Sequence, residues 1–459
     1  MKRRGIVALS ILLLLAAACG RRFQAAEVIA HFYGPTQMAI DPDPHRTDGA
    51  LLYVLNTAGA ALSILNAHTQ EIIKAWSSDP YDETVLRLGR APLDIAITPS
   101  GELLYITDTW RDRVRTVATA DPWTITKTDL VLEGARVSIA PATLDVDTHR
   151  PVVPAAWDAR HEVWFTDPVN SRLLVWDHAA GRLVDEVALP SPPVNLRVSG
   201  DGERVFVVGE DATLRVVDAA DRSLTDIAVS LDGRPDTIVE SRDGAYVYVL
   251  NIDPPQVHVI RTADWRETED EITFPMAVNG MAMSTDGKLG FITSDDGYLY
   301  YFFVGARRAC GSSATHPYFF DQGPRGDPTI ENVETVDCVT RKETWTITYR
   351  LDLLAWEVEG AKSGLQTNLA YTNQAYISDQ GELKFFIRAG DYRESDGDYF
   401  QFDTNVGVAP VPMGAIPTGV AVTPDLDLPQ YDNVFVADTA GESVDRIFTK
   451  TDKNENAIQ

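Results

Sequence analysis

The chain has 459 residues, of which 44% are hydrophobic and 23% are charged, so it can bury a substantial core and is not globally disordered. Its formal net charge is −27 at pH 7. Such an acidic surface repels nucleic acid and anionic lipid head groups, and it favours cations and basic partners. The composition therefore argues against a nucleic-acid-binding protein.

The N-terminal segment predicts export. A basic start and an apolar run lead to small residues and Cys19, which is the pattern of a signal peptide over residues 1–18. The order LAAAC at residues 15–19 resembles the lipobox of bacterial lipoproteins, and this resemblance implies lipidation of Cys19 and a linker over residues 19–26. Because Gly20 follows the cysteine, it also implies retention at the outer membrane. The alternative is a soluble exported protein whose signal happens to end near a cysteine.

A short hairpin recurs along the chain. Residues 98–109, TPSGELLYITDT, predict two alternating strands around a Ser-Gly turn, and similar hairpins follow at 241–251 and 284–294. In most units a third strand and a more variable fourth strand follow. Four strands that recur at about 40 residues predict an all-β fold, the β-propeller. The units start at Pro35, Pro92, Pro154, Pro193, Pro235, Ala277 and Pro417.

These starts predict a seven-bladed β-propeller. Blades one to six occupy residues 27–304 and blade seven occupies residues 401–448, followed by a polar tail over 449–459. Residues 27–33 are expected as the outermost strand beside the C-terminal strands, because such closure removes an exposed sheet edge. A faint repeat at 368–379 leaves an eight-bladed ring as the alternative.

The step from Ala277 to Pro417 is much longer than one blade needs. Residues 305–400 are therefore predicted to form a small β domain inserted between blades six and seven. This segment contains Cys310 and Cys338, for which a disulfide is the default in an oxidising compartment. Two buried, unpaired thiols are the alternative.

Three strand ends carry a resemblance to a known repeat. The sequences YVLN at 53–56, YITD at 105–108 and YVLN at 248–251 resemble the YVTN-type propeller repeat of extracytoplasmic bacterial proteins. The similarity covers most of residues 27–304 and 409–448. It implies the propeller fold, whereas the repeat itself serves many roles.

Catalytic motifs are absent from the sequence, which contains no GxSxG, P-loop, CxxC or HExxH pattern. Polar residues at the starts of the inner strands are expected to surround one mouth of the central channel. Their oxygens could bind Ca²⁺ or a small polar ligand, and the alternative is that they cap backbone groups. The candidates are Gln37, Asp94, Asn195, Asp236 and Asn279. Two long acidic turns, at 41–49 and 424–433, are a second place where Ca²⁺ is conceivable.

The sequence thus predicts an outer-membrane lipoprotein that acts as a scaffold for a protein or an envelope polymer. The insertion is the expected recognition element, because binding often resides in insertions on one face of a repeat. The lipid anchor is the only expected membrane contact. A resemblance of some YVTN-like propellers to lactonases implies the alternative, a channel-mouth and possibly Ca²⁺-dependent hydrolase in which Asp94, Asn195 and Asn279 hold the metal. A purely structural envelope protein is a third possibility.

Overall fold

The computed structural model describes most of residues 27–450. The predicted signal peptide, Cys19, the linker and the C-terminal residues 451–459 lie outside the described residues, as do Cys338 and the side chain of Cys310. In the part that is described, no helix is long and apolar enough to cross a membrane. The other residues not described are 31, 47–49, 76, 78–84, 121–123, 146–147, 149, 269–271, 275, 305–307, 311, 315–316, 321, 323–327, 336–337, 339, 342, 391–392, 407–410, 414–415, 425 and 427–430.

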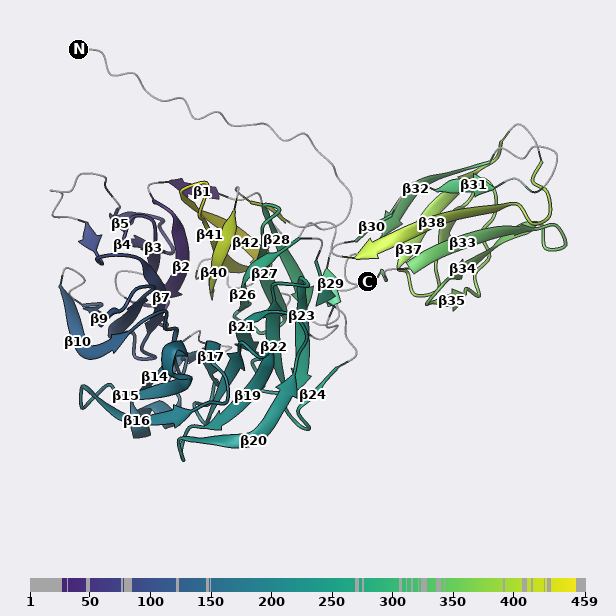
Figure 1. Ribbon diagram of the computed structural model, residues 1–459. Coiled ribbons are helices and arrows are strands. Elements are labelled where there is room, and N and C mark those ends of the chain that lie inside the picture. Colours follow the sequence, from purple (N-terminus) through teal and green to yellow (C-terminus); the bar gives the residue numbers. More distant parts are fainter. Residues whose placement is uncertain are drawn as a thin grey trace, which may run out of the picture.

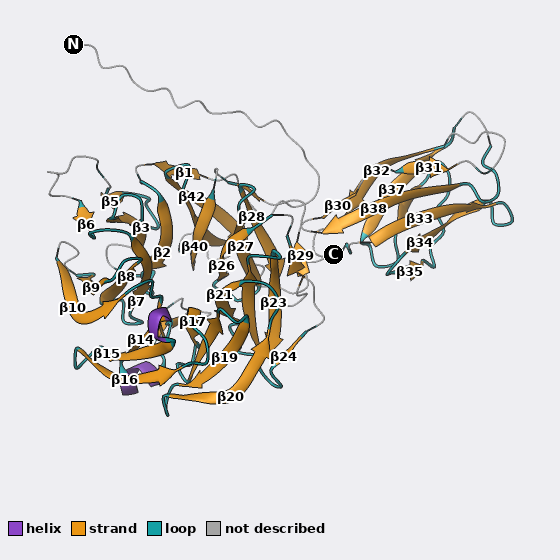
Figure 2. Cartoon of the chain, viewed as in Figure 1, coloured by secondary structure: helices purple, strands orange, loops and turns teal. Residues whose placement is uncertain are grey.

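Antiparallel sheets are arranged around a common centre in the larger part of the molecule (Figures 1 and 2). We name each sheet by its innermost strand. The β2 sheet contains β2 (Pro35–Ile40), β3 (Leu51–Asn56), β4 (Ala61–Asn66), β5 (Ile72–Lys74) and β6 (Leu86–Arg87). The β7 sheet contains β7 (Pro92–Ile97), β8 (Leu103–Asp108), β9 (Asp112–Ala118) and β10 (Ile125–Leu132). The β11 sheet contains β11 (Val137–Ile139), β14 (Glu162–Asp167), β15 (Arg172–Asp177) and β16 (Arg182–Ala188).

Four further sheets continue the arrangement. The β17 sheet contains β17 (Pro193–Val198), β18 (Arg204–Gly209), β19 (Thr213–Asp218) and β20 (Ser223–Ser230). The β21 sheet contains β21 (Pro235–Glu240), β22 (Tyr246–Asn251), β23 (Gln256–Arg261), β24 (Arg266–Glu267) and β25 (Ile272–Thr273). The β26 sheet contains β26 (Val278–Met283), β27 (Leu289–Ser294), β28 (Tyr298–Phe303), β29 (Arg308–Cys310) and β39 (Val411–Pro412). The β40 sheet contains β40 (Pro417–Pro424), β41 (Tyr431–Asp438), β42 (Ser443–Lys450) and β1 (Glu27–Ala30).

Neighbouring sheets pack face to face. The middle strands are buried on both faces, so they carry continuous apolar runs rather than a simple alternation, and all six residues of β3 are buried. Apolar clusters join each sheet to the next; in one of them Leu62 and Ile64 of β4 pack with Leu104 and Ile106 of β8. The result is an all-β, propeller-like fold, as the repeats predict.

The innermost strands form a closed cycle of contacts. Around the centre, β2 contacts β7, and contacts continue through β11, β17, β21, β26 and β40 back to β2. At the outside of the β40 sheet, β1 pairs antiparallel with β42 from Glu27–Arg446 to Ala30–Ser443. The two ends of the described chain therefore share one sheet.

The prediction of an inner strand at Pro154 is wrong. Residues Ala155–Arg160 form the helix α1, and the innermost strand of that sheet is β11, which precedes it. Pro154 stands at the N-cap, where its missing N–H costs no helical hydrogen bond, and the buried Trp157 anchors the turn. Between β11 and α1 the chain forms a small hairpin of β12 (Thr143–Leu144) and β13 (Pro151–Val152).

The inserted segment forms two sheets of its own beside the ring (Figure 1). One contains β30 (Ser312–Ala314), β31 (Tyr318–Phe320), β33 (Glu343–Arg350), β34 (Ala355–Gly360), β35 (Gly364–Leu365) and β38 (Tyr399–Val406). The other contains β32 (Thr329–Thr335), β36 (Ala375–Ile377) and β37 (Leu383–Arg388). Their aromatic core includes Trp345, Trp356, Phe385, Phe400 and Phe402.

The expected boundaries of the insertion need correction. It was placed at 305–400, yet β29 at Arg308–Cys310 pairs with β28 of the ring, and β38 of the insertion runs on to Val406. The first strand of the β40 sheet starts at Pro417, as the repeat predicts, whereas residues 401–406, which were assigned to blade seven, belong to β38 of the insertion. The faint repeat at 368–379 contributes β36 to the inserted sheets, so it adds no sheet to the ring.

Candidate functional site: a capped central channel

Residues of the inner strands alternate between the sheet and the central channel. In β17, Leu196 and Val198 are only 4% and 2% exposed, whereas the intervening Arg197 and the preceding Asn195 are partly exposed. This is the period of two expected of a strand. The pairing of each inner strand with the next strand of its own sheet identifies equivalent positions in different sheets. The position of Asn195 is occupied in four other sheets by Gln37, Asp94, Arg136 and Thr237.

A cavity of about 510 Å³ occupies this channel. Four of the five candidates proposed from the sequence line it, namely Gln37, Asp94, Asn195 and Asp236. The fifth, Asn279, does not: its Nδ2 donates to Asp295 Oδ1 at 2.8 Å and to the Pro417 carbonyl at 2.9 Å. Asn279 therefore joins the β26 sheet to the β40 sheet.

Asp94 uses both carboxylate oxygens within the fold. Its Oδ1 accepts from the Ile95 N–H at 2.9 Å, and its Oδ2 accepts from the Val137 N–H of the neighbouring β11 at 3.0 Å. Burial raises the pKa of Asp94, while the Arg136 guanidinium and these two N–H groups act in the opposite direction. The carboxylate therefore links β7 to β11, which favours the capping interpretation over that of a metal ligand.

The other three candidates that line the cavity differ in how many hydrogen bonds their side chains make. Asn195 Oδ1 accepts from the Leu196 N–H at 2.8 Å, and Asp236 Oδ2 accepts from the Thr237 hydroxyl at 2.9 Å. Among the described residues, the Gln37 amide makes no hydrogen bond and the Asn195 amide nitrogen donates none. Two neutral amides thus present polar atoms to the cavity.

Three arginines that the sequence reasoning did not select also line the cavity, namely Arg136, Arg197 and Arg242. The Arg136 guanidinium makes one long hydrogen bond, from Nη1 to the Leu93 carbonyl at 3.5 Å. Within the described part of the chain, the Arg197 guanidinium has no hydrogen bond and no ion pair. Burial lowers the pKa of Arg197, and the nearby Glu240 and Asp94 carboxylates oppose that shift.

The hairpin β12–β13 lies across one mouth of the channel. Arg242 of the β21 sheet donates to the Leu144 carbonyl of the hairpin and to the Thr285 carbonyl of the β26 sheet. On the other side, a His45 ring nitrogen lies 2.9 Å from the Thr148 carbonyl. Residues 141–144 line the cavity directly. The hairpin therefore caps the mouth at which the inner strands end.

The long acidic turns have partners of their own. Asp41 accepts from the Asp43 N–H at 3.0 Å and from Arg46 at 2.7 Å, and Asp432 accepts from the backbone N–H and hydroxyl of Thr285. Asp48, Asp425 and Asp427 lie outside the described residues. Among the residues that are described, no group of three or more His, Cys, Asp or Glu side chains could hold a metal ion.

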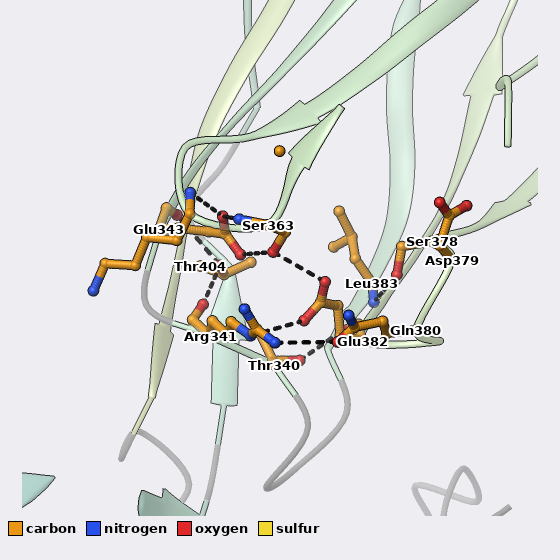
Figure 3. A network of polar contacts seen from close by, with 12 residues as sticks. Thr340, Arg341, Glu343, Ser363, Ser378, Asp379, Gln380, Glu382, Leu383 and Thr404 are labelled. Carbon is orange, nitrogen blue, oxygen red and sulfur yellow. Dashed lines mark hydrogen bonds and ion pairs between the residues drawn. The ribbon is translucent and has the colours of Figure 1, made fainter. Parts of the chain in front are cut away.

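A buried polar network in the insertion is shown in Figure 3. The Glu343 carboxylate accepts from the N–H groups of Lys362 and Ser363, both at 2.8 Å, and from the Ser363 hydroxyl at 2.5 Å. The same hydroxyl lies 3.1 Å from the buried Glu382, whose other oxygen is 3.9 Å from Arg341. These contacts fasten the turn between β34 and β35 to β33 and to the residue before β37, which is a structural role.

Comparisons with known proteins bear on the fold. No protein-family model matches the chain, and no curated protein matches it. A solved chain of hydrazine synthase from Kuenenia stuttgartiensis is similar with a TM-score of 0.54 and 16% identity, covering 92% of this chain and 97% of that chain. A functionally unknown protein from Desulfotomaculum acetoxidans has a TM-score of 0.46 and 16% identity, over 61% of this chain and 85% of that one. The first likeness supports the propeller-like fold and says nothing about chemistry.

Proposed function

We propose that this chain is an outer-membrane lipoprotein, anchored through Cys19, whose ring is a seven-bladed propeller acting as a scaffold. Its inserted β domain is the recognition element, and its partner is a protein or an envelope polymer. The N-terminal sequence supports the anchor, and the closed cycle of inner strands from β2 to β40 supports the blade number.

The observation that carries this proposal is the way the insertion is attached. Its first and last strands pair with each other, Ser312 opposite Val406, so the segment leaves and rejoins the ring at one point. It also has its own aromatic core around Trp345 and Trp356. A separately packed unit on a single attachment is suited to display rather than to completing the ring.

The insertion also exposes apolar side chains. Leu351, Leu353 and Leu354 lie in the turn between β33 and β34, and Leu354 is 69% exposed; Tyr318 on β31 is 67% exposed. Clustered apolar residues on a surface are typical of interaction sites. The turn is therefore the first part of the insertion to test.

Crosslinking in intact source cells, followed by recovery of the protein, tests the scaffold. One strain lacks residues 312–406, replaced by a short Gly-Ser linker, which the pairing of Ser312 with Val406 permits. A second carries Leu353→Ser and Leu354→Ser, and its matched control carries Leu183→Ser, an exposed leucine on β16. We expect a specific partner with the wild type and the control, and its loss in the other two. Recovery of the same partner after the deletion would contradict the proposal.

We also propose a disulfide between Cys310 and Cys338, which would fasten the entry to the insertion. Mass spectrometry of the exported protein, digested with and without reductant, tests it. Peptides containing free thiols at both positions in the unreduced sample would show that the bond does not form.

A further inference from the structure

We propose that the capped channel is a binding site for a small organic carboxylate, held by the guanidinium groups of Arg197 and Arg136. This site is independent of the scaffold role and of the insertion.

The first step of the argument is the unused donors. A guanidinium carries five N–H donors in a planar fork that matches a carboxylate. Among the described residues, Arg197 donates to no acceptor, and Arg136 donates one bond of 3.5 Å. Both line the cavity: Arg197 lies on β17, and Arg136 directly precedes β11, which contacts β17. Among the described residues, two guanidinium groups thus line one cavity with most of their N–H donors unused.

The second step concerns the sign of the ligand. The cavity also contains carboxylates, which would suit a cation if their oxygens were free. Each of them, however, already accepts at least one hydrogen bond within the fold: Asp94 accepts two backbone N–H bonds, Asp236 accepts the Thr237 hydroxyl, and Glu240 accepts the Gly200 N–H at 2.6 Å. By contrast, among the described residues the Arg197 guanidinium has no hydrogen bond and that of Arg136 has one long bond, with the Gln37 and Asn195 amides also lining the cavity. Guanidinium N–H donors without a partner favour a ligand that supplies acceptor oxygens.

The third step concerns size and access. The cavity volume of about 510 Å³ lies within the range of roughly 300–1,000 Å³ that small-molecule sites occupy. The hairpin, fastened by Arg242 to Leu144, obstructs one mouth of the channel. A ligand that enters from the opposite mouth meets the Gln37 and Asn195 level first and Arg197 deeper, two residues further along β17.

Isothermal titration calorimetry on the full exported chain tests the proposal. The probes are succinate, citrate and glutamate, with inorganic phosphate and sulfate as comparison anions. The variants are Arg197→Met, which keeps the length of the side chain, and Arg197→Lys, which keeps its charge. The matched control is Arg182→Met, an exposed arginine on β16 outside the channel.

We expect at least one carboxylate to bind the wild type and the Arg182→Met control equally. In Arg197→Met the Kd of this carboxylate rises about tenfold to a hundredfold, because charge-assisted hydrogen bonds are lost. The Kd of Arg197→Lys lies between those of the wild type and Arg197→Met. Thermal unfolding of each variant verifies folding; if Arg197→Met is not folded, the Arg197→Lys comparison decides. Three results would overturn the proposal: no carboxylate binds the wild type at about 10 mM, the inorganic anions bind but no carboxylate does, or the Arg197 variants bind as the wild type does.

Discussion

At the scale of single residues, Asp432 is a buried carboxyl group between two sheets. It is 1% exposed, and its two oxygens accept from the Thr285 hydroxyl at 2.5 Å and the Thr285 N–H at 3.0 Å. Burial raises the pKa of its carboxyl group from 3.8 to about 7, in spite of these bonds. The contact joins β41 to the turn before β27, so its strength depends on the protonation of one group.

This carboxyl group gives the fold a pH dependence of definite sign. The unfolded chain releases the Asp432 proton near pH 4, whereas the folded chain retains it up to about pH 7. Between these values the folded state binds more protons, so this group's contribution to stability falls as the pH rises. In Asp432→Asn that fall disappears, and the variant gains stability relative to the wild type from pH 4 to pH 7, by at most ~4 kcal/mol.

Urea unfolding at several pH values measures the effect. Asp226→Asn, an exposed aspartate on β20, is the control and should follow the wild type at every pH. A constant difference between Asp432→Asn and the wild type across this range would show that the group ionises normally.

Arg115 forms a buried ion pair whose loss should be costly. Its side chain is 2% exposed and that of Asp108 is 1% exposed, with Nη1 and Oδ2 3.3 Å apart. Removing one partner leaves a buried charge, so Arg115→Met should lower the free energy of unfolding by about 3 kcal/mol. Arg113, two residues earlier on β9, faces Asp129 at 3.7 Å in solvent, and Arg113→Met should cost less than about 1 kcal/mol. Chemical denaturation compares the two variants; equal losses would contradict this assignment.

At the scale of elements, two glycines of the inner strands lie against the backbone of a neighbouring inner strand. A Cβ on Gly419 would lie 2.3 Å from the Thr36 carbonyl oxygen, and one on Gly280 would lie 2.3 Å from the Thr418 carbonyl oxygen. These glycines occupy the position that carries Asp94 and Asn195 in other sheets. The β26, β40 and β2 strands can therefore pack backbone to backbone.

Gly419→Ala tests this packing. Because the obstructing atom is a backbone oxygen, the strands must move apart, and the free energy of unfolding should fall by about 1–3 kcal/mol. Gly200→Ala is the control, since its nearest neighbours, Glu240 and Thr143, lie 3.6 and 4.0 Å away. Thermal unfolding of both variants gives the comparison. An unchanged unfolding temperature for Gly419→Ala would mean that the strands can accommodate a methyl group at this point.

The elements that could be predicted are those whose sequence pattern lies within a short stretch of the chain. The hairpin repeat is local, so the sequence predicts the all-β, propeller-like fold. The β11 strand was missed because Val137–Ile139 is short and its partner, Glu162–Asp167, lies beyond a hairpin and a helix. The proline repeat was therefore matched to Pro154, which begins a helix.

The site shows the same limit. Four cavity residues were found because they stand near the start of inner strands. Arg197 lies two residues beyond Asn195, on the same side of the strand, and the alternation of β17 would have identified it had cations been sought beside carboxylates. Arg136 was missed because the inner strand of its sheet was predicted at Pro154 instead of at β11. The position of the β12–β13 hairpin depends on the contact of Arg242 with Leu144, and a contact between residues so far apart in the sequence cannot be predicted from a local pattern.

At the scale of the whole molecule, the ring and the insertion are joined sparingly. The insertion begins and ends at one strand pair, Ser312 with Val406, while β29 and β39 on either side of it both pair with β28. The β26 sheet is thus built from both flanks of the insertion. The binding pocket lies inside the ring, whereas the exposed leucines near Leu353 lie in the insertion, so the two proposed activities can be removed separately.

The pairing of β1 with β42 has a consequence for how the chain is made. A polypeptide emerges from the ribosome N-terminal end first, so Glu27–Ala30 appear long before Ser443–Arg446, the residues they pair with. Until β42 has been made, β1 lacks the strand with which it pairs in the folded protein. A product that ends before Ser443 lacks β42, and an unpaired sheet edge of this kind is prone to aggregate. Closure of the ring therefore depends on synthesis through the residues of β42.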